Sequence, residues 1–235
     1  MTYKHLSFVS LFAVAALSAS AQRNVENFNF GWQFHRGNID VTAINTSDGS
    51  WETINVPHDF QISQPWVAPA ANESEDNSDG ASNFKSRLSA RGFKEMGDGW
   101  YVKTYTPAAD MKGRRILLDF EGIMYVGDVY LNGKRIGGTD YGYLGFDIDV
   151  SKLLKYGQAN TIAVHASTSG PLNSRWYTGG GLYRDVKIVS TPADIYFVRH
   201  PLYVTTTDNH LVNLQVEVAN YTKQNNVKLQ TVVKD

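Results

Sequence analysis

Cysteine is absent from the 235 residues of this chain. Neither a disulfide framework nor a lipid-modified cysteine is therefore available, and the folded state must rely on its hydrophobic core. An excess of charge of one sign is missing as well, because 22 Lys and Arg stand against 23 Asp and Glu, a formal net charge of −1. Proteins that bind nucleic acid usually carry a basic surface, so this balance argues against nucleic acid as a partner.

Long apolar runs are also missing, apart from one near the N-terminus. That run covers residues 6–17, follows a lysine and a histidine, and precedes Ala19-Ser20-Ala21. A short apolar run before a small-x-small site is the pattern of a secretory signal peptide, here over residues 1–21, and is too short to span a bilayer comfortably. A buried N-terminal helix is the alternative. The signal peptide predicts a periplasmic or secreted protein whose mature form begins near Gln22.

Helical periodicity is scarce, and strand-like alternation takes its place. Apolar side chains recur at every second position in 212–218, and Phe146 and Ile148 alternate with acidic residues. Asn132-Gly133 follows an apolar run and is the strongest short signal for a β-hairpin. Residues 151–157 alone suggest a helical turn. Short strands at regular spacing predict an all-β antiparallel sandwich.

Two β-domains are expected on either side of Thr191-Pro192-Ala193. The first covers residues 22–191. The second starts at 192 and runs to 235, with strands expected near 195–198, 202–204, 212–218 and 227–232. A β-sandwich of the immunoglobulin type takes about seven strands, so we expect the second domain to be incomplete within this chain.

One long segment, residues 65–98, breaks the strand rhythm. It is polar and acidic in its middle, where Glu73 and Glu75 lie. Loops of this length within a compact domain are either functional or disordered. The segment is therefore either disordered or an arm that reaches a neighbouring substrate site.

The densest group of functional side chains lies at residues 173–184. Asn173 and Ser174 precede Arg175 and Trp176, and three glycines follow at 179–181. Aromatic faces, a planar guanidinium and backbone that allows close approach can hold a polyhydroxylated ring at the rim of a sheet. The other interpretation is a tight glycine turn with an aromatic plug and an arginine paired to a carboxylate.

This segment resembles the SRWY-x-G-x-G-[IL]-YR signature of glycoside hydrolase family 2, which contains β-galactosidases, β-glucuronidases and β-mannosidases. Further segments resemble that family in the same order along the chain. They are Phe30-Gly31-Trp32-Gln33-Phe34, the PHD-containing stretch 51–60, Gly99-Trp100-Tyr101-Val102-Lys103, Phe120-Glu121-Gly122 and Val129-Tyr130-Leu131-Asn132-Gly133. Single matches of this kind are weak, but their order over most of the chain identifies the family resemblance.

The resemblance implies a fold and an activity. It implies a jelly-roll, galactose-binding-like β-sandwich followed by an immunoglobulin-like β-sandwich, here truncated, and then a (β/α)8 barrel that holds two catalytic glutamates. No alternating βαβα pattern is present here, so we expect no catalytic residue and no hydrolysis by this chain alone. The pairs Glu73/Glu75 and Asp147/Asp149 are interpreted as solvated edge charges. The parent protein would be a retaining exo-β-glycosidase, with β-galactosides as the leading substrate class.

The resemblance also implies roles for individual residues. Asn173, Ser174, Arg175 and Trp176 are expected to contact the sugar, although some relatives have an aspartate where Asn173 or Ser174 stands here. A second group is expected to be structural and consists of Pro57, Asp59, Gly179, Gly181 and Arg184. We expect Asp59 to cap backbone amides and Arg184 to fix the glycine turn.

No cofactor is expected, and the six histidines show no spacing that suggests a metal site. The expected partners are a β-glycoside and the catalytic barrel of the same parent chain. A different class of function stays open, namely a free-standing carbohydrate-binding β-sandwich without catalysis.

Overall fold

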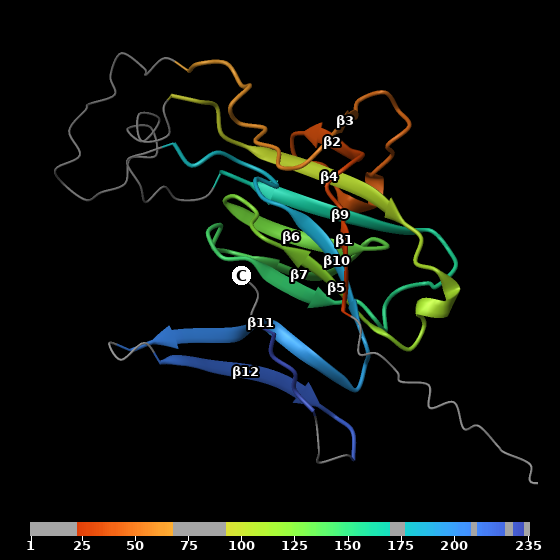
Figure 1. Ribbon diagram of the computed structural model, residues 1–235. Coiled ribbons are helices and arrows are strands. Elements are labelled where there is room, and N and C mark those ends of the chain that lie inside the picture. The colour runs from red at the N-terminus through yellow and green to blue at the C-terminus, as the bar shows by residue number, and fades with distance from the viewer. Residues whose placement is uncertain (1–22, 68–92, 170–176, 208–210, 224–227, 233–235) are drawn as a thin grey trace, which may run out of the picture.

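The computed structural model describes residues 23–67, 93–169, 177–207, 211–223 and 228–232. The regular secondary structure of this part of the chain is almost entirely antiparallel β-strand, as the sequence predicts (Figure 1). The helical elements described are two single 3-10 turns, η1 (Val41–Ala43) and η4 (Ala109–Met111). No helix in the described ranges is long and apolar enough to cross a membrane. Residues 1–22, which contain the predicted signal peptide, lie outside the described residues.

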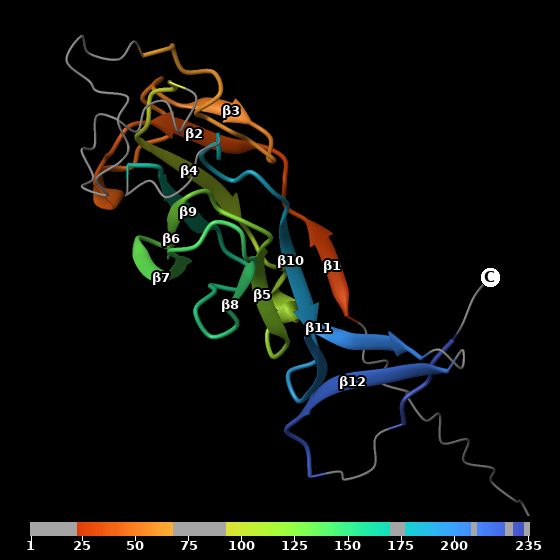
Figure 2. The ribbon, with the colours of Figure 1, turned by 90° about the vertical axis from the view of Figure 1, so that its left-hand side faces the viewer.

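Two sheets form the larger unit. The first has six strands in the order β3 (Glu52–Ile54), β2 (Trp32–Arg36), β4 (Asp98–Tyr105), β9 (Asn160–Ser167), β6 (Val126–Leu131) and β7 (Lys134–Thr139). The second has four strands in the order β1 (Asn24–Asn27), β10 (Val186–Thr191), β5 (Arg115–Phe120) and β8 (Phe146–Asp149). The chain passes repeatedly from one sheet to the other, as in a jelly roll, and Figure 2 shows the sheets in separate layers.

The predicted hairpin at Asn132-Gly133 is confirmed. Both residues have positive φ, 52° and 81°, and they join β6 to β7. A two-residue loop with this geometry matches the right-handed twist of its strands, and Asn and Gly are the residues that tolerate it best. Residues 151–157 form two short turns, and in the first of them the Leu154 amide donates to the Val150 carbonyl at 3.1 Å.

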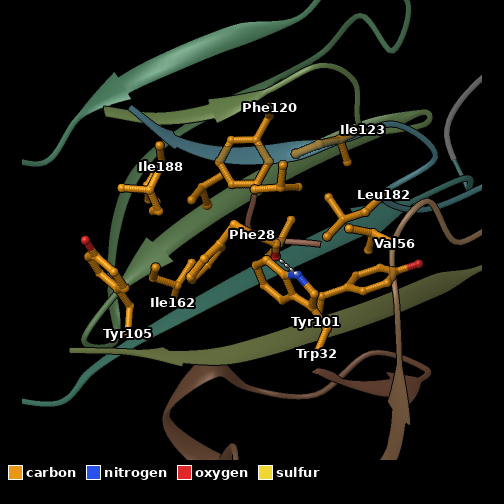
Figure 3. Packing of buried hydrophobic residues seen from close by; sticks show 14 of the residues in the cluster. Phe28, Trp32, Val56, Tyr101, Tyr105, Phe120, Ile123, Ile162, Leu182 and Ile188 are labelled. Atoms are coloured by element: carbon orange, nitrogen blue, oxygen red, sulfur yellow. Dashed lines mark hydrogen bonds between the residues drawn. The ribbon is translucent and has the colours of Figure 1, made fainter. Parts of the chain in front are cut away.

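The main core fills the space between the two sheets (Figure 3). Trp32 and Tyr101 from the six-stranded sheet and Phe120 from the four-stranded sheet are 0% exposed. The indole Nε1 of Trp32 donates to the Phe28 carbonyl at 2.8 Å, so this buried polar group is satisfied. Burying rings of this size contributes on the order of 2–3 kcal/mol each, which suits a chain without disulfides.

The opposite face of the six-stranded sheet is covered as well. Trp100, Val102 and Ala163 form a second buried cluster there, against Trp51 and other apolar residues of the loop between β2 and β3. Trp100 and Tyr101 are adjacent, so their side chains point to opposite faces of β4, and both are buried. Consequently the middle of β4, residues 100–102, is a run of three apolar residues rather than an alternating pattern.

The rest of the described chain is a two-stranded ribbon. The predicted strands at 195–198 and 202–204 are parts of one strand, β11 (Ile195–Thr206), which pairs with β12 (Val212–Asn220) and has a bulge between Phe197 and Leu202. The ribbon begins four residues after β10 ends at Thr191. The strand predicted at 227–232 is wrong within the described residues 228–232, where Leu229 and Val232 are exposed. An apolar segment becomes a strand only when another edge pairs with it.

Candidate functional site

The residues expected to contact the sugar, Asn173, Ser174, Arg175 and Trp176, lie outside the described residues. The structure does describe the chain from Tyr177 onward. It shows that this continuation packs against the turn at residues 56–61, which carries the PHD sequence. These two regions are the candidate site.

The carboxylate of Asp59 joins the two regions. Oδ1 accepts hydrogen bonds from the backbone amides of Gln61 and Gly180, both at 2.9 Å, and Oδ2 accepts one from the Tyr177 hydroxyl at 2.8 Å. The first of these bonds caps an amide of the aspartate's own turn. The other two reach across 118 and 121 positions of sequence. We call Asp59, the Gln61 amide, Tyr177 and Gly180 the Asp59 clasp.

Backbone hydrogen bonds continue this connection beyond the clasp. The amides of His58 and Phe60 donate to the carbonyls of Leu182 and Gly180 at 2.7 and 2.9 Å. On its other side, Gly181 exchanges two hydrogen bonds with Met124, at 2.6 and 2.8 Å. Residues 180–182 are thus held between the PHD turn and the chain that leads into β6.

The glycines at 179–181 are required by this close packing. A Cβ on Gly179 would lie 2.7 Å from Oδ2 of Asp59, and one on Gly181 would lie 2.1 Å from the Tyr101 hydroxyl oxygen. Gly180 would meet the Thr168 side chain at 2.6 Å. Gly179 and Gly181 also have positive φ, 75° and 115°. No larger residue fits without displacing a neighbour.

Burial determines the protonation states around the clasp. Burial, and then the hydrogen bond to Asp59 and its negative charge, raise the pKa of Tyr177 far above the usual range for tyrosine. Burial also raises the pKa of Tyr101. Burial lowers the pKa of His58, and the nearby carboxylates of Glu52 and Asp59 oppose this only in part. Both tyrosines therefore stay protonated at neutral pH and can donate hydrogen bonds.

A second polar contact involves His58, the residue before Asp59. Nδ1 of His58 is 2.9 Å from the Tyr101 hydroxyl. That hydroxyl also has a hydrogen bond with the backbone of Leu182. Because an uncharged imidazole can accept a hydrogen bond at Nδ1, Tyr101 can donate to it while accepting from the backbone. The histidine of the PHD sequence therefore holds the buried tyrosine in place.

The role expected for Arg184 stays a prediction. In the described structure the hydrogen bonds to the glycine segment come from Asp59 and the backbone, whereas Arg184 is exposed and its guanidinium carbon lies 5.0 Å from the centre of the Tyr183 ring. A guanidinium only donates hydrogen bonds, so the expected role of Arg184 would act through backbone carbonyls or a carboxylate. Pro57 lies exposed at the start of the turn, after a cis peptide bond.

The two ends of the long segment 65–98 meet beside the PHD turn. Residues 68–92 lie outside the described residues, but Trp66 and Lys94 form an antiparallel bridge and the Val67 amide donates to the Phe93 carbonyl at 2.7 Å. The Lys94 ammonium lies 4.1 Å from the centre of the Trp66 ring, which is 72% exposed. The sequence analysis did not identify Trp66 as a candidate residue. A single tryptophan at the start of a long polar segment is nevertheless a pattern that the sequence shows by itself.

Asp149 and His165 have structural partners in the described residues. Asp149, the last residue of β8, pairs with Arg115 at 3.1 Å and accepts a hydrogen bond from the Ser151 hydroxyl. Both contacts stabilise the end of that strand. His165 lies 3.0 Å from Asp98 and stacks on Trp100. Glu73 and Glu75 lie outside the described residues. Within the described part of the chain, no three metal-ligating side chains come together.

A family model and several relatives match this chain. The model described as glycosyl hydrolase 2 galactose-binding domain-like matches residues 87–174. A β-galactosidase of Bacteroides ovatus is 30% identical over 196 residues, which cover 83% of this chain and 21% of the relative. A β-glucuronidase of Formosa agariphila is 32% identical over 197 residues, 78% of this chain and 18% of that protein. The chain thus spans about a fifth of the length of these relatives.

Solved structures agree with the sequence comparison. A β-glycosidase from Bacteroides vulgatus superimposes with a TM-score of 0.69 and 28% identity, over 86% of this chain and 25% of that structure. A glycosyl hydrolase family 2 member from Bacteroides cellulosilyticus gives a TM-score of 0.64 at 32% identity, over 77% and 22%. Together with the ordered motifs and the β-sandwich, these matches show that the chain belongs to glycoside hydrolase family 2 and carries its galactose-binding-like N-terminal domain.

Proposed function

We propose that this chain is the non-catalytic N-terminal part of a retaining exo-β-glycosidase. The observation that carries the proposal is the match of residues 87–174 to the family's galactose-binding-like domain, within a chain that spans about a fifth of its glycosidase relatives. Retaining hydrolysis needs an acid/base and a nucleophilic carboxyl group about 5–5.5 Å apart. We assign both to a (β/α)8 barrel of the same parent protein, which makes that barrel the main partner of this domain.

We assign β-galactosides as the first substrate class and β-glucuronides as the second. The first is supported by the overall resemblance of the sequence Arg175–Arg184 to the signature of the family's β-galactosidases. The relative named a β-galactosidase supports it as well. The second is supported by the relative named a β-glucuronidase at similar identity. Residues of the barrel would decide between them, because they surround the reacting sugar ring.

The contribution of this domain is to support and complete the sugar pocket from one side. Asn173, Ser174, Arg175 and Trp176 are the proposed sugar contacts, and the clasp holds the chain immediately after them. An open rim encloses little of a ligand, so the isolated domain should bind monosaccharides with a Kd in the millimolar range or weaker. The signal-like sequence at 1–21 supports export to the periplasm or the medium.

A free-standing carbohydrate-binding module is the alternative function, and one set of assays separates the two. The parent protein should hydrolyse a chromogenic β-galactoside or β-glucuronide, while the 235-residue chain alone should hydrolyse neither. Calorimetry on residues 22–191 should show no micromolar sugar binding. Turnover by the chain alone that is lost when one of its own acidic residues is replaced, or micromolar binding by the isolated domain, would contradict the proposal.

A further inference from the structure

The ribbon of β11 and β12 leaves the sandwich at one end (Figure 2), and a cleft of about 1040 Å³ lies at this junction. On the sandwich, its walls come from the segment between η4 and β5 and from the turns at 151–157. On the ribbon, they come from the end where β11 starts and β12 stops, at Tyr196 and Tyr221. Sites for organic ligands usually measure about 300–1,000 Å³, so this cleft has room for a short oligosaccharide. We call it the ribbon cleft.

Positive charge is concentrated in the ribbon cleft. The described residues that line it include Lys112, Arg114, Arg115 and Lys152, and Asp149 is the one carboxylate among them. The chain as a whole has a formal net charge of −1, so this excess of positive charge is local. A cleft lined by charges of one sign focuses the field and raises the local concentration of ligands of the opposite sign. The ribbon cleft is therefore suited to an anionic ligand.

The cations of the cleft differ in what they contact. Arg115 donates from Nε to Oδ2 of Asp149 at 3.1 Å, and its guanidinium carbon lies 4.3 Å from the centre of the Tyr196 ring. It is therefore held between two neighbours. Lys112 and Lys152 are exposed, and neither forms an ion pair with another described residue. Each ammonium group has three donors, which leaves both lysines able to bind an anionic group of a ligand.

Tyrosine rings line the same cleft. The centres of the Tyr196 and Tyr221 rings lie 6.1 Å apart with an interplanar angle of 35°, and Tyr221 is 75% exposed. Tyr156 also lines the cleft, and its hydroxyl donates to the Ser151 carbonyl at 2.8 Å. A tyrosine ring offers a flat apolar face with a polar edge, which suits the apolar face of a sugar ring. Rings beside unpaired cations fit an acidic sugar better than they fit a bare ion or a neutral sugar.

We propose that the ribbon cleft is a binding site for a short acidic oligosaccharide, whose sugars carry carboxylate or sulfate groups. Lys112 and Lys152 bind the anionic groups, and Tyr221 packs against a sugar ring. The inference goes beyond the proposed function, because it holds whichever glycoside the parent protein hydrolyses. Binding at this cleft would keep the parent protein on an acidic polysaccharide.

Nucleic acid is the other polyanion that cations and aromatic rings bind together. Two observations favour the acidic sugar. The chain belongs to a family of glycoside hydrolases, and its basic residues do not outnumber its acidic ones. Proteins that bind nucleic acid usually carry an overall basic surface.

The test is calorimetric binding to the full-length parent protein. The acidic ligands are trigalacturonate, which carries carboxylates, and a sulfated maltotriose. Both are α-linked, so a β-glycosidase does not consume them, and unmodified maltotriose is the neutral counterpart. We expect at least one acidic trisaccharide to bind about tenfold more tightly than maltotriose, and its binding to weaken between about 0.05 and 0.5 M salt because ions screen exposed charges. The tighter of the two identifies the anionic group.

Variants locate the binding in the cleft. The double variant Lys112→Gln with Lys152→Gln should raise the Kd of the acidic trisaccharide by about tenfold, since exposed ion pairs contribute up to about 1 kcal/mol each. Tyr221→Ala should raise it by about fivefold through the loss of the ring contact. The matched control is Lys134→Gln with Lys228→Gln, which removes the same charge from two exposed lysines that do not line the cleft. The control should change the Kd by less than about twofold.

The remaining outcomes would overturn the proposal. Maltotriose that binds as tightly as both acidic ligands would remove the role of charge. A Kd that the double variant at Lys112 and Lys152 leaves unchanged, or that the control raises equally, would place the binding elsewhere. Tighter binding of single-stranded DNA of about ten nucleotides would assign the cleft to nucleic acid. A parent protein without glycosidase activity refutes the proposed function alone, because these binding measurements do not depend on hydrolysis.

Discussion

Arg199 of β11 reaches across to Asp119 of β5 and donates to its Oδ1 from Nε at 3.2 Å and from Nη2 at 2.9 Å. The arginine lies in the bulge of β11, next to His200, whose φ is 52°. Its Nη1 also donates to the Gly145 carbonyl at 3.1 Å. A β-bulge changes the direction in which a side chain points, and here it directs a guanidinium from the ribbon onto the sandwich.

Replacing Arg199 by alanine should loosen the ribbon from the sandwich. The Asp119 side chain is only 14% exposed, so it would keep a poorly solvated charge without its partner, and we expect a loss of about 1–3 kcal/mol in the free energy of unfolding. Chemical denaturation measures the loss. Arg135→Ala is the control, because its pair with Asp128 is exposed and should contribute at most about 1 kcal/mol. Equal effects of the two substitutions would contradict the assigned role.

Alanine at Gly181 should strongly destabilise the domain. The new Cβ would lie 2.1 Å from the Tyr101 hydroxyl oxygen in a backbone conformation with φ 115°, so both a collision and backbone strain arise. We expect a loss of at least about 3 kcal/mol, measured by thermal or chemical unfolding. Gly49→Ala separates the two causes, because Gly49 has φ 81° and open space around it, and should cost about 1 kcal/mol. A mild effect at Gly181 would show that residues 180–182 are not packed as described.

Stability should fall in mildly acidic solution because of His58. Burial lowers the pKa of this histidine in the folded state below its usual value of about 6.5, so the unfolded chain binds the proton more readily. The contribution of His58 is complete above about pH 6.5 and is lost as the pH falls toward the folded-state pKa. Unfolding curves between pH 7.5 and about 5 should show this slope, and His58→Gln should reduce it. An unchanged slope in that variant would assign the effect to other groups.

The effect of a buried side chain without hydrogen bonds on stability can be tested at Gln61. Its side chain is 0% exposed, and neither the amide nitrogen nor the amide oxygen has a hydrogen-bond partner in the described structure. Replacing an unpaired buried polar group by an apolar one of similar size is neutral or stabilising. Gln61→Leu should therefore keep or raise the free energy of unfolding, by up to about 1 kcal/mol. A clear loss would mean that a buried water or ligand satisfies the amide.

Much of the fold could be predicted from the chain because the signals involved are local. Alternation with a period of two identified β12, and Asn132-Gly133 identified the β6–β7 hairpin, since both depend on residues next to one another in sequence. The order of short motifs identified the family in the same way. The strand expected at 227–232 shows the limit of such signals, because an apolar pattern does not say whether a partner strand is available.

Only the tertiary structure decided which side chains meet. Asp59 was recognised as the cap of its own turn, but its bonds to Tyr177 and Gly180 join residues more than a hundred positions apart. The same holds for Arg199 and Asp119, and for the loop that covers Trp100. A linear pattern records the spacing of residues along a strand, whereas these contacts depend on how ten strands are ordered in two sheets, which is settled only when the whole sandwich assembles.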